Sequence, residues 1–282
     1  MARLTWLRDW SHSDRVTLRV LCLPGAGTAA HTYRRWSQLL PADIGVVAVE
    51  LPGHGSRLSE PPVRTVREIL DPLAEEVATL ADRPLVIFGH SMGAAVGAEL
   101  ARLLRRERGI TPALLIAAAR EAPRPARDRD YTKWLSEDGA RTFLREMGGT
   151  PPELLRNEDY LALMLPPLRA DLAVLAGPWP EDTEPLDCPV RVYLGDSDTG
   201  VRPDQAAGWR AESNGDFAVH TFDSGHFFVH DRTAEVLAQL CADVTDTIGC
   251  PDRPRTASAP SYGQLHRPVP ADRVRRPCDR QR

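Results

Sequence analysis

Short runs of apolar and often β-branched residues alternate along the chain with longer stretches in which apolar positions recur every three or four residues. A short apolar run is typical of a strand buried on both faces of a sheet, and the longer spacing is typical of a helix with one apolar face. The pattern predicts strands at Leu18–Leu23, Val46–Leu51, Leu85–Phe88, Ala113–Ala117, Val190–Leu194 and Ala218–Phe222. It predicts helices at 31–40, 65–82, 92–107 and 232–247. This alternation favours an α/β fold with a mostly parallel, doubly wound sheet.

The alternation is interrupted once, between the strand ending near residue 118 and the strand starting near residue 190. An unstructured loop of that length is improbable in a compact domain. Helical patterns occur within the interval at 137–147, 151–165 and 168–176. We therefore expect a helical insertion at about 119–185 that lies on one side of the sheet as a lid.

Composition divides the chain into a domain and a tail. The 282 residues are 42% hydrophobic, which suffices for one large domain with a buried core, and we place that domain at 1–250. The stretch 251–282 instead holds eight Arg against three Asp, six Pro and almost no apolar periodicity. Such a segment cannot bury enough apolar surface to offset its ordering entropy, so we expect a disordered tail rather than a binder of acidic partners.

Charge, cysteine usage and apolar run lengths exclude several classes of function. The net charge of −4 gives no sign of nucleic-acid binding, and the five Cys are scattered without a CxxC or Cys/His cluster. Neither a disulfide framework nor a metal site is therefore indicated. No apolar run approaches the ~18 residues that span a bilayer, and the N-terminus lacks the apolar core of a signal peptide. We expect a cytoplasmic protein without membrane association, and the absence of a glycine-rich phosphate loop implies no nucleotide cofactor.

The segment Gly89-His90-Ser91-Met92-Gly93 has the G-x-S-x-G spacing of a nucleophile elbow. It follows a predicted strand and opens a predicted helix, which is the context that this motif requires. Small residues two positions from the serine let strand and helix approach closely, and the strained turn exposes the serine Oγ. Ser91 is therefore the predicted nucleophile, with a chance match in a glycine-rich turn as the alternative. His90 is interpreted as structural.

A serine nucleophile needs a general base. Where such an elbow carries a catalytic triad, the acid follows the serine in the chain and the histidine comes after the last strand. His226 fits, because it follows the strand ending at Phe222 and because Gly225 permits a tight turn before it. His230 is the competing candidate, but we expect it on the following helix. His220 lies within a predicted strand and is interpreted as a packing residue.

The acid should follow the strand Val190–Leu194, where Gly195-Asp196-Ser197-Asp198 offers two carboxylates. Asp198 is deeper in the loop and better placed to reach the histidine, so we prefer it. Asp196 fits a turn former that bonds to its own backbone.

The tetrahedral intermediate of acyl transfer needs backbone N–H donors. One is predicted at Met92, directly after the nucleophile, and the other at Ala26, in the glycine turn after the first predicted strand. A second turn, Pro52-Gly53-His54-Gly55, follows the next strand; we interpret it as a turn near the rim and His54 as non-catalytic.

Together these residues resemble the stand-alone type II thioesterases of polyketide and nonribosomal peptide biosynthesis, which belong to the α/β-hydrolase superfamily. The resemblance spans residues 5 to about 245, and the elements in the insertion are more specific than the elbow. The matching segments are Leu23–Gly27, Trp36, Val49–Gly53, Phe88–Ala94, Met147–Thr150, Leu165–Asp171, Gly195–Asp198 and Gly225–Phe228. The family pattern also places the acid on the second Asp of its loop, here Asp198.

The chain departs from the family pattern at three places. His54 stands where the family commonly has Arg, and the residues after Asp171 lack the Glu and Tyr that the family usually shows there. The tail after residue 250 has no counterpart in the family.

The resemblance implies an α/β-hydrolase fold and a serine thioesterase that removes aberrant or stalled acyl groups from the phosphopantetheine arm of acyl or peptidyl carrier proteins. It implies that no metal or bound cofactor is needed, since the phosphopantetheine belongs to the substrate. We also expect a monomer. Three alternatives stay open: a small-molecule serine esterase or lipase with the same triad, a non-catalytic carrier-binding scaffold on a degenerate hydrolase fold, and acyl transfer to an acceptor other than water.

Overall fold

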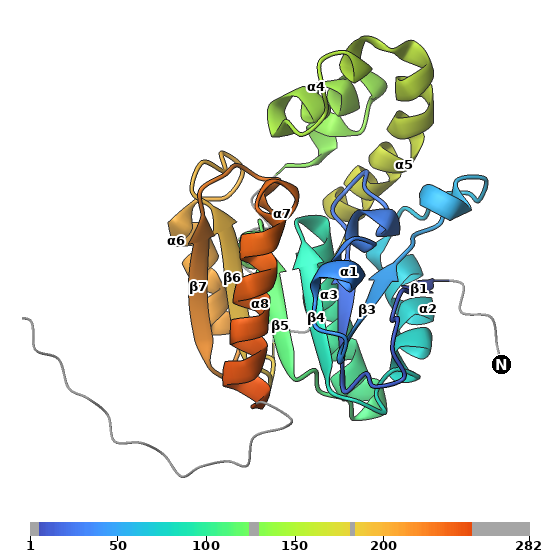
Figure 1. The fold of residues 1–282 in the computed structure, drawn as a ribbon. Coiled ribbons are helices and arrows are strands. Elements are labelled where there is room, and N and C mark those ends of the chain that lie inside the picture. The colour runs from blue at the N-terminus through green and yellow to red at the C-terminus, as the bar shows by residue number, and fades with distance from the viewer. Residues whose placement is uncertain (1–5, 124–129, 181–183, 250–282) are drawn as a thin grey trace, which may run out of the picture. The chain divides into compact units, whose positions relative to one another are not determined.

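The computed structural model describes residues 6–123, 130–180 and 184–249, and these residues form a seven-stranded sheet flanked by helices (Figure 1). The strand order is β1-β3-β2-β4-β5-β6-β7, and every neighbouring pair is parallel except β1 and β3. The prediction of an α/β fold with a mostly parallel sheet is confirmed. The strands are β1 (Leu7–Asp9), β2 (Leu18–Leu23), β3 (Ile44–Val49), β4 (Leu85–His90), β5 (Leu114–Ala118), β6 (Val190–Gly195) and β7 (Phe217–Phe222).

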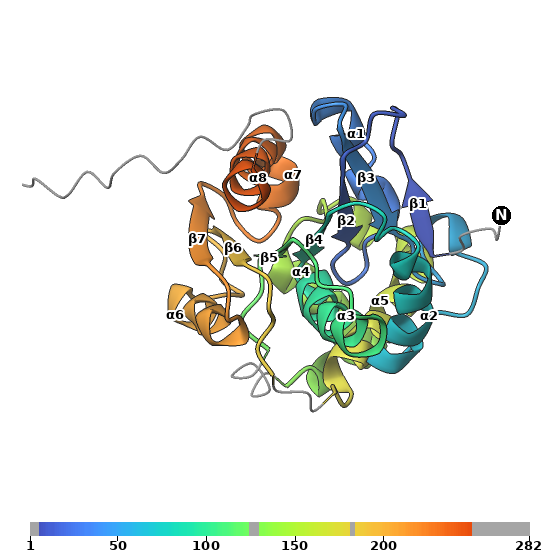
Figure 2. The same cartoon turned by 90° about the horizontal axis from the view of Figure 1, so that it is seen from below.

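Helices cover both faces of the sheet, and each face has its own apolar core (Figure 2). On one face lie α2 (Val66–Ala78) and α3 (Met92–Arg108); on the other lie α1 (Trp36–Leu39) and α8 (Thr233–Ile248). Alternate residues of one strand enter opposite cores because successive side chains point to opposite faces. In β2, Leu21 and Leu23 pack with α2 and α3, whereas Val20 and Cys22 pack with α1 and α8. This two-sided burial explains the continuous apolar runs that identified the strands.

The interval between β5 and β6 is helical, as predicted. It contains α4 (Glu137–Met147) and α5 (Glu158–Ala176), with short 3-10 turns η4 (Thr132–Trp134) and η5 (Leu154–Arg156). Figure 1 shows α4 and α5 together beyond one end of the strands. Arg141 of α4 pairs with Glu158 at the start of α5, so the two helices are also tied to each other. We refer to this insertion as the lid, after the role that the sequence predicts for it.

One prediction about the lid is wrong. The sequence indicated separate helices at 151–165 and 168–176, but α5 runs unbroken through Pro166 and Pro167. Proline removes a backbone donor and crowds the preceding turn, which normally ends a helix. Here Leu165, Pro167 and Leu168 are all buried, and this packing outweighs the local preference.

Several short elements escaped prediction. The predicted helix at 31–40 is a 3-10 turn, η1 (Ala30–Tyr33), followed by the single turn of α1. Strand β1, helices α6 (Pro203–Ala207) and α7 (Phe228–Asp231), and the 3-10 turns η2 (Gly55–Arg57) and η6 (Gly208–Glu212) were not expected at all, because three to five residues are too few to show a period. The expected tail at 251–282 lies outside the described residues, so the boundary near 250 stays a prediction. Among the described helices, none has the length and apolar character to cross a membrane.

Candidate active site

Ser91 occupies the sharp turn between β4 and α3, with φ 52° and ψ −113°. A positive φ is costly for a residue with a side chain, and it persists only where the surroundings enforce it. The surroundings here are two close backbone approaches. A Cβ at Gly89 would lie 2.3 Å from the Gly93 carbonyl oxygen, and a Cβ at Gly93 would lie 2.2 Å from the Leu23 carbonyl oxygen. The turn leaves Ser91 half-exposed while His90 and Met92 on either side are buried.

The two predicted oxyanion donors come from separate loops next to Ser91. Met92 is the first residue of α3, where N–H groups lack an intrahelical acceptor. Ala26 belongs to the loop after β2, and a Cβ built on its neighbour Gly25 would lie 3.4 Å from the Ser91 Cβ. Within the described part of the chain, neither the Ala26 N–H nor the Met92 N–H donates to a backbone carbonyl. Both donors are thus available to a ligand.

His226 lies in the loop between β7 and α7, and its Nδ1 is 2.8 Å from Oδ2 of Asp198. Asp198 follows β6, and its side chain is 1% exposed. Its second oxygen accepts the Gly200 N–H at 2.7 Å, so the carboxylate is fixed from both sides. The two loops meet backbone to backbone, since a Cβ at Gly195 would lie 2.3 Å from the Gly225 carbonyl oxygen. The geometry pairs the two residues that the sequence proposed as base and acid.

The competing candidates lie elsewhere. Asp196 is exposed, and its Oδ1 accepts the side-chain hydroxyl of Ser197 at 2.9 Å, whereas the sequence favoured a bond to its own backbone. His230 lies on α7, where its ring stacks on Phe227 rather than pairing with Asp198. His220 lies within β7, and its Nε2 is 3.2 Å from Oδ1 of Asp243 on α8.

His90 connects the nucleophile turn to the base. Its Nε2 is 2.9 Å from the backbone carbonyl oxygen of His226, and its ring is 2% exposed. Burial, assisted by the nearby His226, lowers the pKa of His90 to about 3. The ring is therefore neutral at ordinary pH, and Nε2 must carry the proton because a carbonyl only accepts. His90 therefore acts as a buried, neutral hydrogen-bond donor to the backbone of His226, which is consistent with the structural role expected for it.

The lid contacts the site beside His226. Gly149, just after α4, has φ +79°, and a Cβ there would lie 2.5 Å from the ring of Phe227. A Cβ at Gly200, in the loop of Asp198, would lie 3.5 Å from Cε of Met147 and 3.7 Å from Nδ1 of His226. The end of α4 therefore packs against the loops that carry the proposed acid and base.

The turn at Pro52–Gly55 is not at the rim, contrary to the interpretation of the sequence. His54 is 4% exposed, and its Nε2 is 3.0 Å from Oδ2 of Asp171 on α5. No local signal indicates this contact, because the two residues are 117 positions apart.

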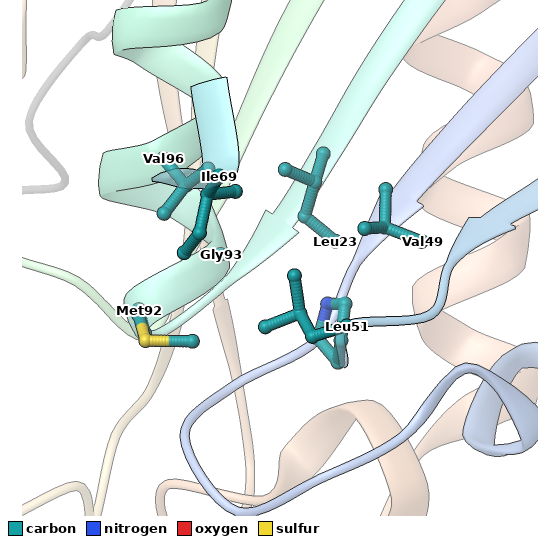
Figure 3. Close-up of a pocket in the computed structure, with 8 residues that line it drawn as sticks. Leu23, Val49, Leu51, Ile69, Met92, Gly93 and Val96 are labelled. Atoms are coloured by element: carbon teal, nitrogen blue, oxygen red, sulfur yellow. The ribbon is translucent and has the colours of Figure 1, made fainter. Parts of the chain in front are cut away.

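Met92 is one of the residues that line a small apolar cavity (Figure 3). Its volume of about 10 Å³ corresponds to roughly one water molecule. The walls come from the ends of β2 and β3 and from α2 and α3; the lining residues are Leu23, Pro24, Val49, Leu51, Ile69, Met92, Gly93 and Val96. Among the described residues, no group of three or more His, Cys, Asp or Glu side chains could hold a metal ion.

Comparison with known proteins identifies the family. Residues 18–244 match the family model described as a thioesterase domain. The gramicidin S biosynthesis protein GrsT of Aneurinibacillus migulanus is 32% identical over 237 residues, which cover 84% of this chain and 92% of that protein. Thioesterase PikA5 of Streptomyces venezuelae is 32% identical over 257 residues, covering 88% of each chain.

Solved structures agree with the sequence relatives. The type II thioesterase BorB from the borrelidin biosynthetic cluster matches with a TM-score of 0.77 at 28% identity, over 86% of this chain and 98% of that one. The α/β-hydrolase fold expected from the sequence is thereby confirmed. The chain belongs to the thioesterase family, and within it to the type II serine thioesterases of nonribosomal peptide and polyketide pathways.

Proposed function

We propose that this protein hydrolyses stalled or aberrant acyl groups from the phosphopantetheine thiol of acyl or peptidyl carrier proteins, with Ser91 as the nucleophile. The observation that carries the proposal is the Asp198–His226 hydrogen bond, which His90 joins to the strained serine turn, in a chain of the thioesterase family. The pathway context comes from relatives named for gramicidin S biosynthesis and the borrelidin cluster.

In the acylation step, His226 takes the proton from Ser91 Oγ through Nε2, because Nδ1 is engaged with Asp198. Oγ then forms a bond to the thioester carbonyl carbon, and the carbonyl electron pair moves to oxygen. The N–H groups of Ala26 and Met92 stabilise this oxyanion. When the carbonyl re-forms, the carbon–sulfur bond breaks and the thiolate takes its proton from the imidazolium of His226.

Deacylation repeats the sequence with water. His226 removes a proton from water, and the resulting hydroxide attacks the acyl-serine carbonyl. Collapse of the second oxyanion breaks the bond to Oγ, which regains its proton from His226 and releases the carboxylic acid. Asp198 stabilises the imidazolium in both steps and fixes its orientation.

The proposed reaction uses groups of this chain and of its substrate alone. The phosphopantetheine arrives covalently attached to the carrier, so the protein itself needs no cofactor. The carrier must approach the sheet edge that α4 and α5 cover, because Ser91 follows β4 at that edge. We include in the proposal that the protein is cytoplasmic and that it is a monomer.

Substrate preference tests the proposal against a general esterase. We expect kcat/KM to be highest for an acetyl group on a carrier protein, lower for the free pantetheine thioester, and lowest for the matching oxygen ester. If the oxygen ester is the best substrate, the protein is a small-molecule esterase instead. A serine-directed fluorophosphonate separates either enzyme from a non-catalytic scaffold, since a scaffold would leave Ser91 unlabelled.

A further inference from the structure

A carboxylate of the lid helix reaches into the loop that carries one of the proposed oxyanion donors. Asp171 lies on α5 and is 1% exposed. Its Oδ2 accepts the backbone N–H of Gly27 at 2.7 Å and also contacts Nε2 of His54 at 3.0 Å. Its Oδ1 is buried without a hydrogen-bond partner among the described residues. A buried carboxylate is costly unless it is paired, so these Oδ2 contacts hold it in place.

The contact with Gly27 restrains the backbone next to the proposed donor Ala26. The peptide between Ala26 and Gly27 is planar, so holding the Gly27 N–H fixes the whole peptide plane next to the Ala26 N–H. Gly27 has φ +71°, and a Cβ there would lie 3.1 Å from Cδ1 of Leu168. Leu168 precedes Asp171 by three positions and so lies on the same face of α5. Two side chains of the lid helix therefore clamp this loop.

His54 supplies the matching charge. Its Nδ1 is 3.1 Å from the Pro52 carbonyl oxygen, and its Nε2 faces the Asp171 carboxylate. Both neighbours are acceptors, an arrangement that the imidazolium form satisfies at both ring nitrogens. Burial opposes the charged form, but the Asp171 carboxylate raises the pKa of His54 above its ordinary value. The carboxylate of Glu50 at the end of β3 also faces this site, and it accepts the N–H groups of Ala30 and Ser56. The loops after β2 and β3 are thus anchored on one buried cluster of charges.

We propose that Asp171 and His54 are positioning residues of the oxyanion hole, which couple the seating of lid helix α5 to the placement of the Ala26 N–H. Neither residue touches the substrate. The inference rests on the proposed function through the role assigned to Ala26. It implies that the lid contributes to the chemical step as well as to substrate enclosure.

The test compares Asp171→Asn with Asp159→Asn, an isosteric change at an exposed position in the first turn of the same helix. With the acetyl thioester of pantetheine, Asp171→Asn should lower kcat by roughly 10–100-fold with little change in KM, because a misplaced donor acts in the transition state. Both chemical steps pass through an oxyanion, so kcat falls whichever step limits it. Asp159→Asn should behave as wild type.

Inhibition by an alkyl trifluoromethyl ketone gives the second readout. Ser91 adds to this ketone, and the resulting oxyanion occupies the same hole, so Ki should rise by the same factor as kcat/KM falls. His54→Gln should reduce kcat in the same direction. It should also restore part of the activity of Asp171→Asn, because Asp171→Asn alone removes the buried carboxylate that faces the His54 ring, whereas two neutral amides at these positions need no counter-charge.

Circular dichroism establishes that each variant is folded at the assay temperature. A lower Tm for Asp171→Asn with unchanged kcat and ketone Ki would overturn the inference, and so would a raised KM at constant kcat. Failure of wild type on carrier thioesters would count against the proposed function alone. The ketone comparison would still decide the positioning role.

Discussion

At the scale of single residues, the site depends on backbone contacts that only glycine allows. The strained conformation of Ser91 exists because Gly89 and Gly93 let β4, α3 and the loop after β2 approach within contact distance. Asp198 is set in the same manner, since Gly195 brings its loop against the loop of His226. These glycines position Ser91 and Asp198 and have no part in the proposed reaction themselves.

The carboxylate pair in the loop after β6 gives a direct test of roles. Asp198→Asn should lower kcat by roughly 10²–10⁴-fold, because an amide favours the wrong tautomer of His226. Asp196→Asn, two positions away and exposed, should remain near wild type. Steady-state kinetics of the two variants suffices. Comparable losses in both would show that the hydrogen bond to His226 is not what matters.

The pH dependence of stability should report on the protonation of His54. Burial disfavours its charged form, but the Asp171 carboxylate, the Pro52 carbonyl and Glu50 together raise the pKa of His54 above its ordinary value. A raised pKa stabilises the folded state below about pH 6.5, and this stabilisation is lost as pH rises through the folded-state pKa. The difference in Tm between wild type and His54→Gln should therefore shrink as pH rises above about 6.5. A constant difference would contradict the imidazolium.

His90 acts in the opposite direction. The pKa of His90 is lower in the folded chain than in the unfolded chain, so at a pH between the two values His90 takes up a proton on unfolding. The stability due to neutral His90 is present above about pH 6.5 and is lost as pH falls toward 3. The two histidines therefore act in separate pH windows, so acid unfolding does not obscure the effect of His54.

At the scale of elements, the lid closes on the site from two sides. The end of α4 packs on Phe227 next to His226, and α5 holds the loop of Ala26 through Asp171. The sequence predicted helices in this interval, because their apolar positions recur at helical spacing. It did not predict that α5 continues through two prolines or that His54 pairs with it, since tertiary packing decides both.

Alanine substitutions at two adjacent glycines of the lid distinguish the effect of backbone strain from that of a steric contact with Phe227. Gly148 and Gly149 both have positive φ, so alanine at either should cost about 1–2 kcal/mol of stability. A Cβ at Gly148 meets nothing within 4 Å, whereas one at Gly149 would lie 2.5 Å from the Phe227 ring. Gly149→Ala should therefore displace Phe227 and lower kcat/KM by roughly tenfold or more, while Gly148→Ala should affect stability alone. Equal kinetic effects of the two changes would argue against a lid that packs on the base.

At the scale of the whole molecule, the parallel sheet gathers the site at one edge. The carboxyl ends of β2, β4 and β6 and the loop after β7 carry Ala26, Ser91, Asp198 and His226, which are far apart in the chain. Alternating strands and helices already imply this convergence, so the proposed site was readable from order and motif. The small cavity lined by Met92 was not, because residues of four separate elements form its walls.

The domain should function without its C-terminal tail. The thioesterase match ends at residue 244 and α8 ends at Ile248, both ahead of the Arg/Pro-rich stretch. We expect deletion of 251–282 to leave Tm and hydrolysis of acyl pantetheine unchanged. Differential scanning calorimetry and a thioester assay check both. A large drop in Tm on truncation would show that the tail packs on the domain.

The central claim is that Ser91 discharges carrier-bound thioesters. Time-resolved intact-mass spectrometry of acetyl- and propionyl-loaded carrier protein, with wild type and Ser91→Ala, tests it most directly. We predict that wild type regenerates the free phosphopantetheine thiol and that the variant is slower by roughly 10⁴-fold or more. If wild type leaves the carrier loaded, or if Ser91→Ala discharges it at a similar rate, the account is contradicted.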